Sequence, residues 1–540
     1  MKLLFIMDSP EYLRFYDSVI DEFAARGHDV RLGVSHGQDR KLVGLQGLTT
    51  YTEGVRVLGL VPEHTGTWGD IAYRLRGIMD FVRYLHPRFA AAPVLRARMK
   101  RKILPLAFHW LDAIPNLPPR AVRLTERMLM AADWAIPVPE DVLAYLREQA
   151  PDVLLVSPLV TAGSEQVDWI KAARLCGIRT AVCIASWDNL TNKGLLRIEP
   201  DLVVVWNETQ KQEAHEFHYV PTEKIVTTGA QLFDRWFLKQ VTRGRDEFCA
   251  RIGLPDTRPF LLFTGSSSFI SRSNVEVPFV RRWIEALRAS DDPVVRDAHI
   301  LVRPHPYNYP EWDSDPLASC PGVTVYPPRR YNPVDEQHRA DFFDSIYHGA
   351  AVVGVNTSAM IEAAIIGRPV LSFLTEEFAR TQEGTIHFHH LLPENGGFVQ
   401  YARTVDEHIR QLSTCLRNPA DARAETERFV STFVRPHGVN RPATPIFVDA
   451  IEGLGAAPAP SPASVPAWAY GVRPLIVMAA AVQFTVARLT GKPLRRLVPK
   501  RVRMSIHHAD KAARRRWNEV QKARKQWQKA IVRPLRSWRS

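Results

Sequence analysis

The chain has 540 residues, of which 46% are hydrophobic and 9% aromatic, so it is long and apolar enough for two or three domains with sizeable cores. Its five cysteines are odd in number and form no CxxC pair, which fits a reducing cytosol better than a disulfide framework, and they show no zinc-ligand spacing. The net charge of +13 is uneven: residues 488–540 hold eighteen Lys/Arg and two acids, a net of +16, which leaves −3 for the rest.

The first half of the chain predicts alternating strands and helices, beginning with the strand Lys2–Met7. Tyr12–Arg26 has helical periodicity, Gly27 ends that helix, and His28–Val34 is the next strand. The later elements that we expect are strands at Val153–Ser157, Thr180–Ala185, Asp201–Trp206 and Ile225–Thr228 and a helix at Ser164–Leu175. Strands that alternate with helices indicate a mainly parallel sheet.

A basic region interrupts this alternation at about residues 83–139. It has ten Lys/Arg between Arg83 and Arg127 but only two acids, Asp112 and Glu126. The default interpretation is a helical insertion with a solvated basic face. The alternative is a patch that rests on an anionic membrane or takes an acidic acceptor.

A second αβ series begins near Arg258. The strand Phe260–Thr264 runs into Gly265-Ser266-Ser267-Ser268, and ligands bind outside the carboxyl ends of such strands. The later elements that we expect are a helix at Val280–Leu287, strands ending at Val302 and spanning Val323–Tyr326, a strand–loop–helix–strand unit at Val352–Phe373, and a closing helix at Pro445–Leu454. Residues 455–467 are a Pro/Ala/Ser linker.

Two loops of this second series offer groups suited to phosphate or ribose. One is Arg303-Pro304-His305-Pro306, in which His305 and Arg303 can face a phosphate. The other is Asn356-Thr357-Ser358, where hydroxyls and a helix N-terminus point at one spot. Glu362 lies one turn further on, among apolar residues, where an unpaired acid is rare unless it has a role such as binding a ribose diol.

These elements, with Glu362-Ala363 and Gly367-Arg368-Pro369-Val370, resemble the nucleotide-binding domain of the GT-B superfamily. The resemblance includes the CDP-glycerol glycerophosphotransferases, capsule Kdo transferases and UDP-N-acetylglucosamine 2-epimerases. It implies an α/β fold with two Rossmann-like domains that face a cleft: an acceptor domain over residues 1–237 and a donor domain over residues 258–454. The donor-binding residues would be Gly265, Ser266, Ser267, Arg303, His305, Asn356, Thr357, Ser358 and Glu362.

The segment Ser186–Gly194 is similar to the W-H-G-T-P-x-K element of the glycerophosphotransferases, but Asp188 stands in place of their proposed catalytic histidine. A carboxylate can still act as general base, so Asp188 is one catalytic candidate, and a turn-forming role is equally compatible with the sequence. His36, after the second strand, is the other candidate base. Trp187, Asn189 and Lys193 would lie in the cleft near the acceptor.

Three further features complete the expectations for the two domains. His387, His389 and His390 lack a nearby carboxylate at metal-ligand spacing, so we expect a polar loop there. Residues 229–234 (GAQLFD) predict a hinge between the domains. We expect no cofactor and no metal, with the nucleotide-activated donor as a substrate.

The tail, residues 468–540, has apolar residues at helical spacing between about His508 and Ile531, including Trp517 and Trp527. This pattern predicts a basic amphipathic helix on an anionic membrane surface. A solvated tail or a nucleic-acid arm is the alternative, and nucleic acid is not the partner that we expect.

The sequence therefore predicts a glycosyltransferase that uses a nucleotide sugar, located in the cytoplasm and peripheral on the inner face of the plasma membrane. Its acceptor would be a surface polysaccharide or a lipid-linked glycan. The alternatives are a CDP-linked polyol-phosphate transferase and a non-catalytic nucleotide-sugar-binding scaffold at the membrane.

Overall fold

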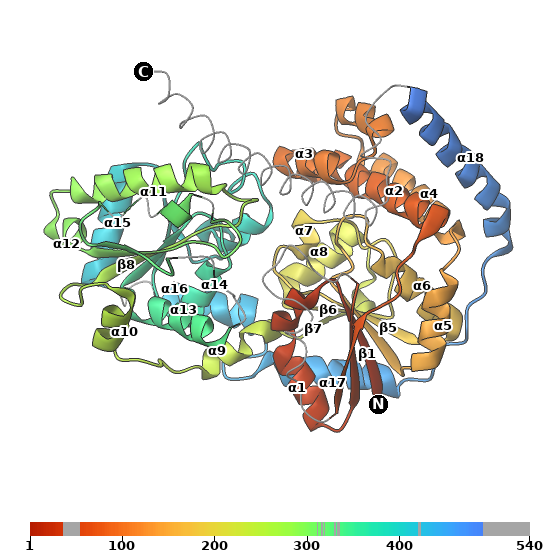
Figure 1. The fold of residues 1–540 in the computed structure, drawn as a ribbon, viewed down its shortest axis with the longest axis horizontal. Coiled ribbons are helices and arrows are strands. Elements are labelled where there is room, and N and C mark those ends of the chain that lie inside the picture. Colours follow the sequence, from red (N-terminus) through yellow and green to blue (C-terminus); the bar gives the residue numbers. More distant parts are fainter. Residues whose placement is uncertain are drawn as a thin grey trace, which may run out of the picture. The chain divides into compact units, whose positions relative to one another are not determined.

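The computed structural model describes residues 1–35, 54–309, 311–314, 317, 319–328, 331, 335–418 and 423–489. One unit of the chain is Met1–Tyr470, and a second begins at Gly471 (Figure 1). His36, one of the two predicted bases, lies outside the described residues, as does the amphipathic helix expected at about 508–531.

The first sheet contains seven parallel strands among the described residues, in the order β3-β2-β1-β4-β5-β6-β7. Most of its strands are apolar and buried, as expected where helices cover both faces. The strands are β1 (Lys2–Met7), β2 (Asp29–Val34), β3 (Val55–Leu60), β4 (Val153–Ser157), β5 (Arg179–Cys183), β6 (Leu202–Val205) and β7 (Ile225–Thr227). The helices of this half are α1 (Asp17–Ala25), α5 (Glu140–Gln149), α6 (Gln166–Cys176), α7 (Asn189–Asn192), α8 (Glu208–His218) and α9 (Asp234–Leu238), with the 3-10 helix η1 (Pro10–Phe15).

Between β3 and β4 lies a helical region with its own hydrophobic cluster, built on residues such as Phe81, Leu95 and Val122. It consists of α2 (Gly66–Val82), α3 (Pro93–Lys102), η5 (Leu106–Ala113) and α4 (Pro119–Ala135). Because α2 packs against both α3 and α4, this helical region begins at Gly66, ahead of the basic stretch. A buried ion network holds it to α6: Arg76 pairs with Asp133 at 2.8 Å and with Asp168 at 2.7 Å.

The second sheet contains six parallel strands among the described residues, in the order β10-β9-β8-β11-β12-β13. Its strands are β8 (Phe260–Thr264), β9 (His299–Arg303), β10 (Val323–Val325), β11 (Ala351–Gly354), β12 (Val370–Phe373) and β13 (Gln400–Ala402). The helices around it are α10 (Arg245–Ile252), α11 (Ser273–Arg288), α12 (Pro293–Arg296), α13 (Glu336–His348), α14 (Ala359–Ile365), α15 (Val405–Arg417) and α16 (Arg423–Phe429). Helices α11, α12 and α15 cover one face, and α10, α13, α14 and α16 cover the other (Figure 1).

After α16 the chain returns to the first half of the unit. The helix α17 (Ala443–Ala456) packs on α1 and places Phe447, Val448 and Ile451 in the core of the first sheet. The carboxylate of Asp234, in the predicted hinge, holds this return: it accepts hydrogen bonds from Arg435 Nη2 at 2.7 Å and from the backbone N–H of Thr444 at 2.6 Å. Asp234 therefore fixes the point where the chain crosses between the two halves.

Two parallel sheets wound in this way, with a C-terminal helix returning to the first, make the α/β GT-B arrangement implied by the resemblance. The linker after α17 is mostly exposed, and it is followed by α18 (Ala467–Leu489). Within the described part of the chain, no helix combines the length and the hydropathy that a membrane span requires.

Candidate functional site

A cavity of about 900 Å³ lies where strands of both sheets end. It is walled by the loops that follow β5, β8, β9 and β11, the end of a parallel sheet at which ligands bind. The predicted site residues that line it are Trp187, Asp188, Gly265, Ser267, Arg303, His305, Asn356, Thr357, Ser358 and Glu362. The structure therefore brings together ten residues that come from four strand ends with their loops and from the helix α14.

The remaining described candidates lie elsewhere. Ser266 is fully buried, its N–H donates to Glu276 at 2.8 Å, and it does not line the cavity. Asn189 and Lys193 line a neighbouring cavity of about 500 Å³, which Asp188 also lines. A ligand that spans the two cavities would therefore pass Asp188.

Arg303 ends β9 and is the buried cation of the site, only 2% exposed. Its Nη1 donates to Ser345 Oγ at 2.9 Å, and its guanidinium lies over the ring of Phe342 at 5.3 Å. Among the described residues, its Nε and Nη2 have no hydrogen-bond partner. Because buried N–H groups without a hydrogen-bond partner are costly, Nε and Nη2 of Arg303 suit an anion in the cavity.

His305 is neutral near pH 7, since burial and the charge of Arg14 lower its pKa to about 4. The backbone N–H of Tyr307 donates to its Nδ1 at 3.2 Å, so in the neutral ring the proton lies on Nε2. Nε2–H is then a donor, which suits a phosphate oxygen.

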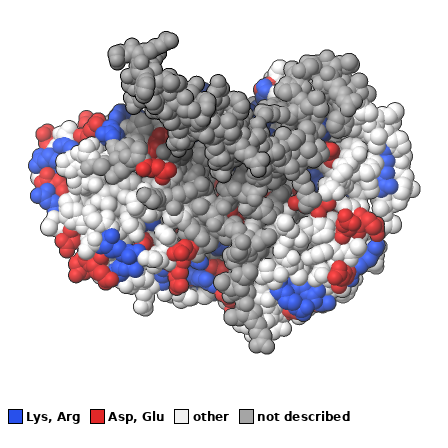
Figure 2. Space-filling model, in the orientation of Figure 1, with Lys and Arg blue, Asp and Glu red and all other residues white. Residues whose placement is uncertain are grey.

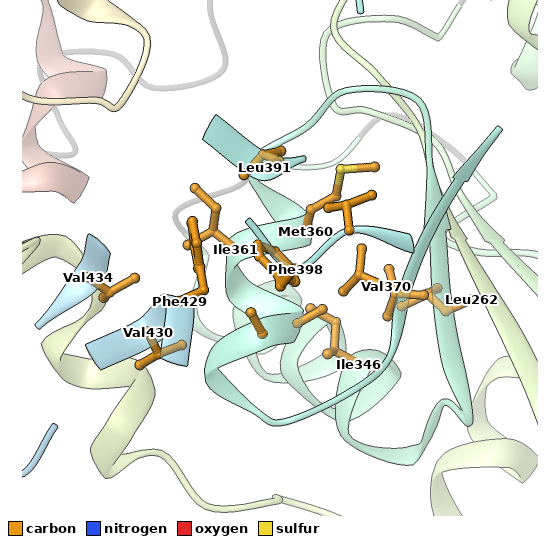
Figure 3. Packing of buried hydrophobic residues seen from close by; sticks show 14 of the residues in the cluster. Leu262, Ile346, Met360, Ile361, Val370, Leu391, Phe398, Phe429, Val430 and Val434 are labelled. Atoms are coloured by element: carbon orange, nitrogen blue, oxygen red, sulfur yellow. The ribbon is translucent and has the colours of Figure 1, made fainter. Parts of the chain in front are cut away.

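The Ser358 hydroxyl accepts a hydrogen bond from a residue that follows the first sheet's strand β5. Trp187 Nε1 donates to Ser358 Oγ at 3.1 Å, although the two residues lie 171 positions apart. The helix α14, which begins after Ser358, is anchored by Met360 and Ile361 in a core that includes Leu262, Ile346 and Val370 (Figure 3). The position of Ser358 is therefore set by both halves of the unit.

Glu362 lies on the side of α14 that lines the cavity. Burial raises its pKa to about 8, and the charges of Arg14 and Lys239 only partly offset this rise. The carboxyl is thus mostly protonated at neutral pH in the free protein. Glu362 is therefore an acid held at a cavity wall.

Asp188 is a carboxylate at neutral pH. Burial raises its pKa, but the opposing effects of Lys193, His387, Ser186 and Arg98 lower the pKa to about 2. Its Oδ1 accepts a hydrogen bond from Asn189 Nδ2 at 3.1 Å. The site therefore holds a fixed negative charge on the side of the first sheet.

The segment that carries Asp188 is pinned by the helical region. Arg83, at the C-terminal end of α2, is 1% exposed and donates to the carbonyl oxygen of Gly194 at 2.7 Å. Tyr84 donates to the carbonyl of Lys193 at 2.6 Å, and Asp80 accepts from the N–H of Leu195 at 2.8 Å. Arg83 begins the basic stretch in sequence, yet it is a buried support for this segment rather than part of a solvated face.

Two charged or titratable residues of the cavity that the sequence did not assign to the site are His387 and Arg14. His387 was expected in a polar loop, but it lies in the 3-10 helix η9 (His387–Leu391), buried against Trp187 with ring centroids 4.8 Å apart. Arg14 lines both cavities and is exposed. Arg14 lies in η1, in the connection that follows the first strand, and that place was the available signal, whereas His387 reaches the site only through tertiary packing.

Among the described residues, no group of three or more His, Cys, Asp or Glu side chains could hold a metal ion.

No protein-family model matches the chain, and no curated protein matches its sequence. Solved structures similar to it include UDP-GlcNAc 2-epimerase from Neisseria meningitidis bound to UDP-GlcNAc, with 12% identity and a TM-score of 0.48 over 84% of this chain and 100% of that one. A glycosyltransferase from Rickettsia africae ESF-5 is similar with 10% identity and a TM-score of 0.47 over 85% and 99%. WaaG, a glycosyltransferase involved in lipopolysaccharide biosynthesis, is similar with 13% identity and a TM-score of 0.44 over 84% and 100%.

Proposed function

We propose that the chain is a glycosyltransferase that uses a nucleotide sugar and transfers the sugar to a hydroxyl of a surface polysaccharide or lipid-linked glycan. The observation that carries this proposal is that Arg303 and Glu362 line one cavity. A buried guanidinium with unused N–H groups suits a diphosphate, and an acid on the same wall suits a ribose. Those are the two parts that every nucleoside diphosphate presents.

Catalysis would rest on charge placement around the leaving group. As the sugar–phosphate bond breaks, negative charge grows on the nucleotide, and donors fixed beforehand lower the barrier. Arg303, neutral His305 through Nε2–H, and the Ser358 hydroxyl would supply those donors. Thr357 lines the cavity beside Ser358 and would offer a further hydroxyl.

The acceptor would enter through the smaller cavity, where Asp188, Asn189 and Lys193 lie. Asp188 is ionised, so it can take the proton of an acceptor hydroxyl as that oxygen attacks the sugar. Trp187 would couple the two substrates, because its indole contacts the donor-side Ser358 while the next residue is the proposed base. His36 remains the second candidate base.

The decisive experiment is a thermal-shift screen of the full-length chain against UDP, CDP, CMP, GDP and ADP. A nucleotide that binds only the folded protein raises its melting temperature. We expect one base to raise it, and we expect His305→Ala to abolish the rise. His437→Ala is the matched control, since His437 is exposed and does not line the cavity.

The outcomes also separate the rival functions. A response to CDP and CMP alone would favour a polyol-phosphate transferase. A nucleotide response without hydrolysis or transfer of the bound sugar, unchanged by Asp188→Asn, would favour a binding scaffold. No response to any nucleotide in a folded chain would remove the basis of the proposal.

We place this activity in the cytoplasm, on the inner face of the plasma membrane, because the predicted acceptors are assembled there. The basic tail is the membrane contact that the sequence predicts.

A further inference from the structure

The outer face of α4 carries cations and large apolar side chains together. Arg120, Arg123, Leu124, Arg127 and Met128 are all exposed and follow the helical repeat of three and four residues, so they share one face. Leu124 is 61% and Met128 60% exposed. The opposite face packs inward through Val122, with Glu126 buried there. The exposed face of α4, named here the α4 face, therefore carries three cations and no acid.

Many cations of the basic region have contacts within the fold. Arg83, Arg88, Arg96, Arg98 and Lys100 contact backbone carbonyls or side chains, and Arg123 of the α4 face is exposed while its guanidinium lies over the ring of Tyr219 at 4.8 Å. The one partly exposed acid of the basic region, Asp112, is paired with Arg96 at 3.1 Å and Lys100 at 2.6 Å. Over the parts of Figure 2 that are not grey, Lys/Arg and Asp/Glu are interspersed. The α4 face, in contrast, has three exposed arginines and no exposed acid among its residues.

We propose that the α4 face docks on an anionic lipid bilayer. The arginines on the helix attract acidic headgroups, while Leu124 and Met128 on the adjoining part of the same face can enter the headgroup and acyl boundary. A nucleic acid would satisfy the arginines but would leave the two apolar side chains without an apolar partner. The combination on one helix favours lipid.

This inference rests on the proposed function and deepens it, because it names the surface that would contact the membrane in which a lipid-linked acceptor is held. Helix α4 packs on α2, and the residues at the end of α2 hold the Ser186–Gly194 segment through Arg83 and Tyr84. A bilayer seated on the α4 face would thus contact the same helical region that supports Asp188. Docking on a bilayer needs no nucleotide. A failure of vesicle binding would therefore contradict this inference alone, and a failure of nucleotide binding would contradict the proposed function alone.

The test uses the full-length chain with a fluorophore on Met128→Cys, in a background where the partly exposed Cys176 and Cys320 are changed to serine. Vesicles of phosphatidylcholine with or without phosphatidylglycerol carry brominated acyl chains as a quencher. The control label is Thr414→Cys, on the exposed side of α15. We expect quenching at position 128 on anionic vesicles and none at position 414.

A charge variant makes the test quantitative. Arg120→Gln with Arg127→Gln should weaken vesicle binding by about 25-fold, at about fivefold per arginine. Arg410→Gln with Arg428→Gln removes two exposed arginines from the second half of the unit and should leave binding near wild type. If the chain sediments with anionic vesicles while the label at position 128 stays unquenched, the tail alone docks and the proposal is wrong. A label that responds to duplex DNA or RNA and not to vesicles also overturns it.

Discussion

The Glu362 carboxyl yields a prediction about pH, because its state in the free protein differs from the state that a ribose prefers. Burial raises its pKa to about 8, and Arg14 and Lys239 only partly offset that rise. The two hydroxyls of a ribose donate hydrogen bonds, and a carboxylate accepts both best. Nucleotide binding near pH 7 should therefore release a proton from Glu362.

The size of the effect follows from the distance between the pH and the pKa. At pH 7 the group lies one unit below its pKa of about 8, so ionising it costs about 1.4 kcal/mol, or tenfold in affinity. The pKa of Glu362 is lower in the nucleotide-bound state than in the free protein, so the affinity must increase with pH. Affinity is greatest above about pH 8 and falls as the pH decreases through that value. Glu362→Gln cannot ionise, so its affinity should be weaker and should not vary with pH through this group.

Calorimetric titration with the nucleotide identified by the thermal screen measures the affinity and the number of protons released on binding. Affinities between about pH 7 and pH 9 give the slope, and two buffers of different ionisation enthalpy give the protons released. The 2′-deoxy nucleotide should lose affinity for wild type and little for Glu362→Gln. Glu336→Gln is the control, because Glu336 is an exposed acid that lines the same cavity. A flat wild-type profile, or a slope that persists in Glu362→Gln, would refute the reasoning.

Three other predictions concern the base, the crossover and a buried acid. If Asp188 is the general base, Asp188→Asn should lower the transfer rate by about 10²- to 10⁴-fold with unchanged nucleotide affinity. A wild-type rate for Asp188→Asn in steady-state kinetics would contradict this role. Asp234→Ala leaves the Arg435 guanidinium buried without its carboxylate, so urea denaturation should show a loss of about 3–5 kcal/mol. Asp449→Ala, which breaks an exposed pair, should cost less than about 1 kcal/mol. Burial raises the pKa of Glu276 from 4.5 to about 8. The free energy of unfolding of the wild type should therefore fall by at most about 5 kcal/mol as the pH rises through this range. Melting curves taken at each pH should show this fall for the wild type and not for Glu276→Gln.

The strands of the two cores were predictable because burial on both faces leaves a continuous apolar run. The predicted bounds of β1, β4 and β8 are those of the structure. The strand β3 was missed because it lies at a sheet edge and its sequence, VRVLGL, carries Arg56 and Gly59 among its apolar residues. The strand β13 was missed because its sequence, QYA, is short and contains no apolar run.

The side of the cavity that the second sheet forms was predictable for a topological reason. In a parallel sheet all the carboxyl ends meet at one edge, so residues that follow β8, β9 and β11 had to gather. Side-chain direction was not predictable, and Ser266 points into the core next to two residues that line the cavity. Contacts between the two halves, such as Trp187 with Ser358 and His387, arise only when the sheets face each other.

The return of α17 to the first sheet has a consequence for synthesis on the ribosome. Phe447, Val448 and Ile451 complete a core whose other members come from the first sheet and its N-terminal helices. When the strands up to β7 have emerged, that core still lacks a helix that lies more than 200 residues further on. At a synthesis rate of about 5–20 residues per second, this apolar face stays open for roughly 10–40 s. The nascent first half is thus a predicted client for chaperones, and it cannot finish folding until the second sheet has been made.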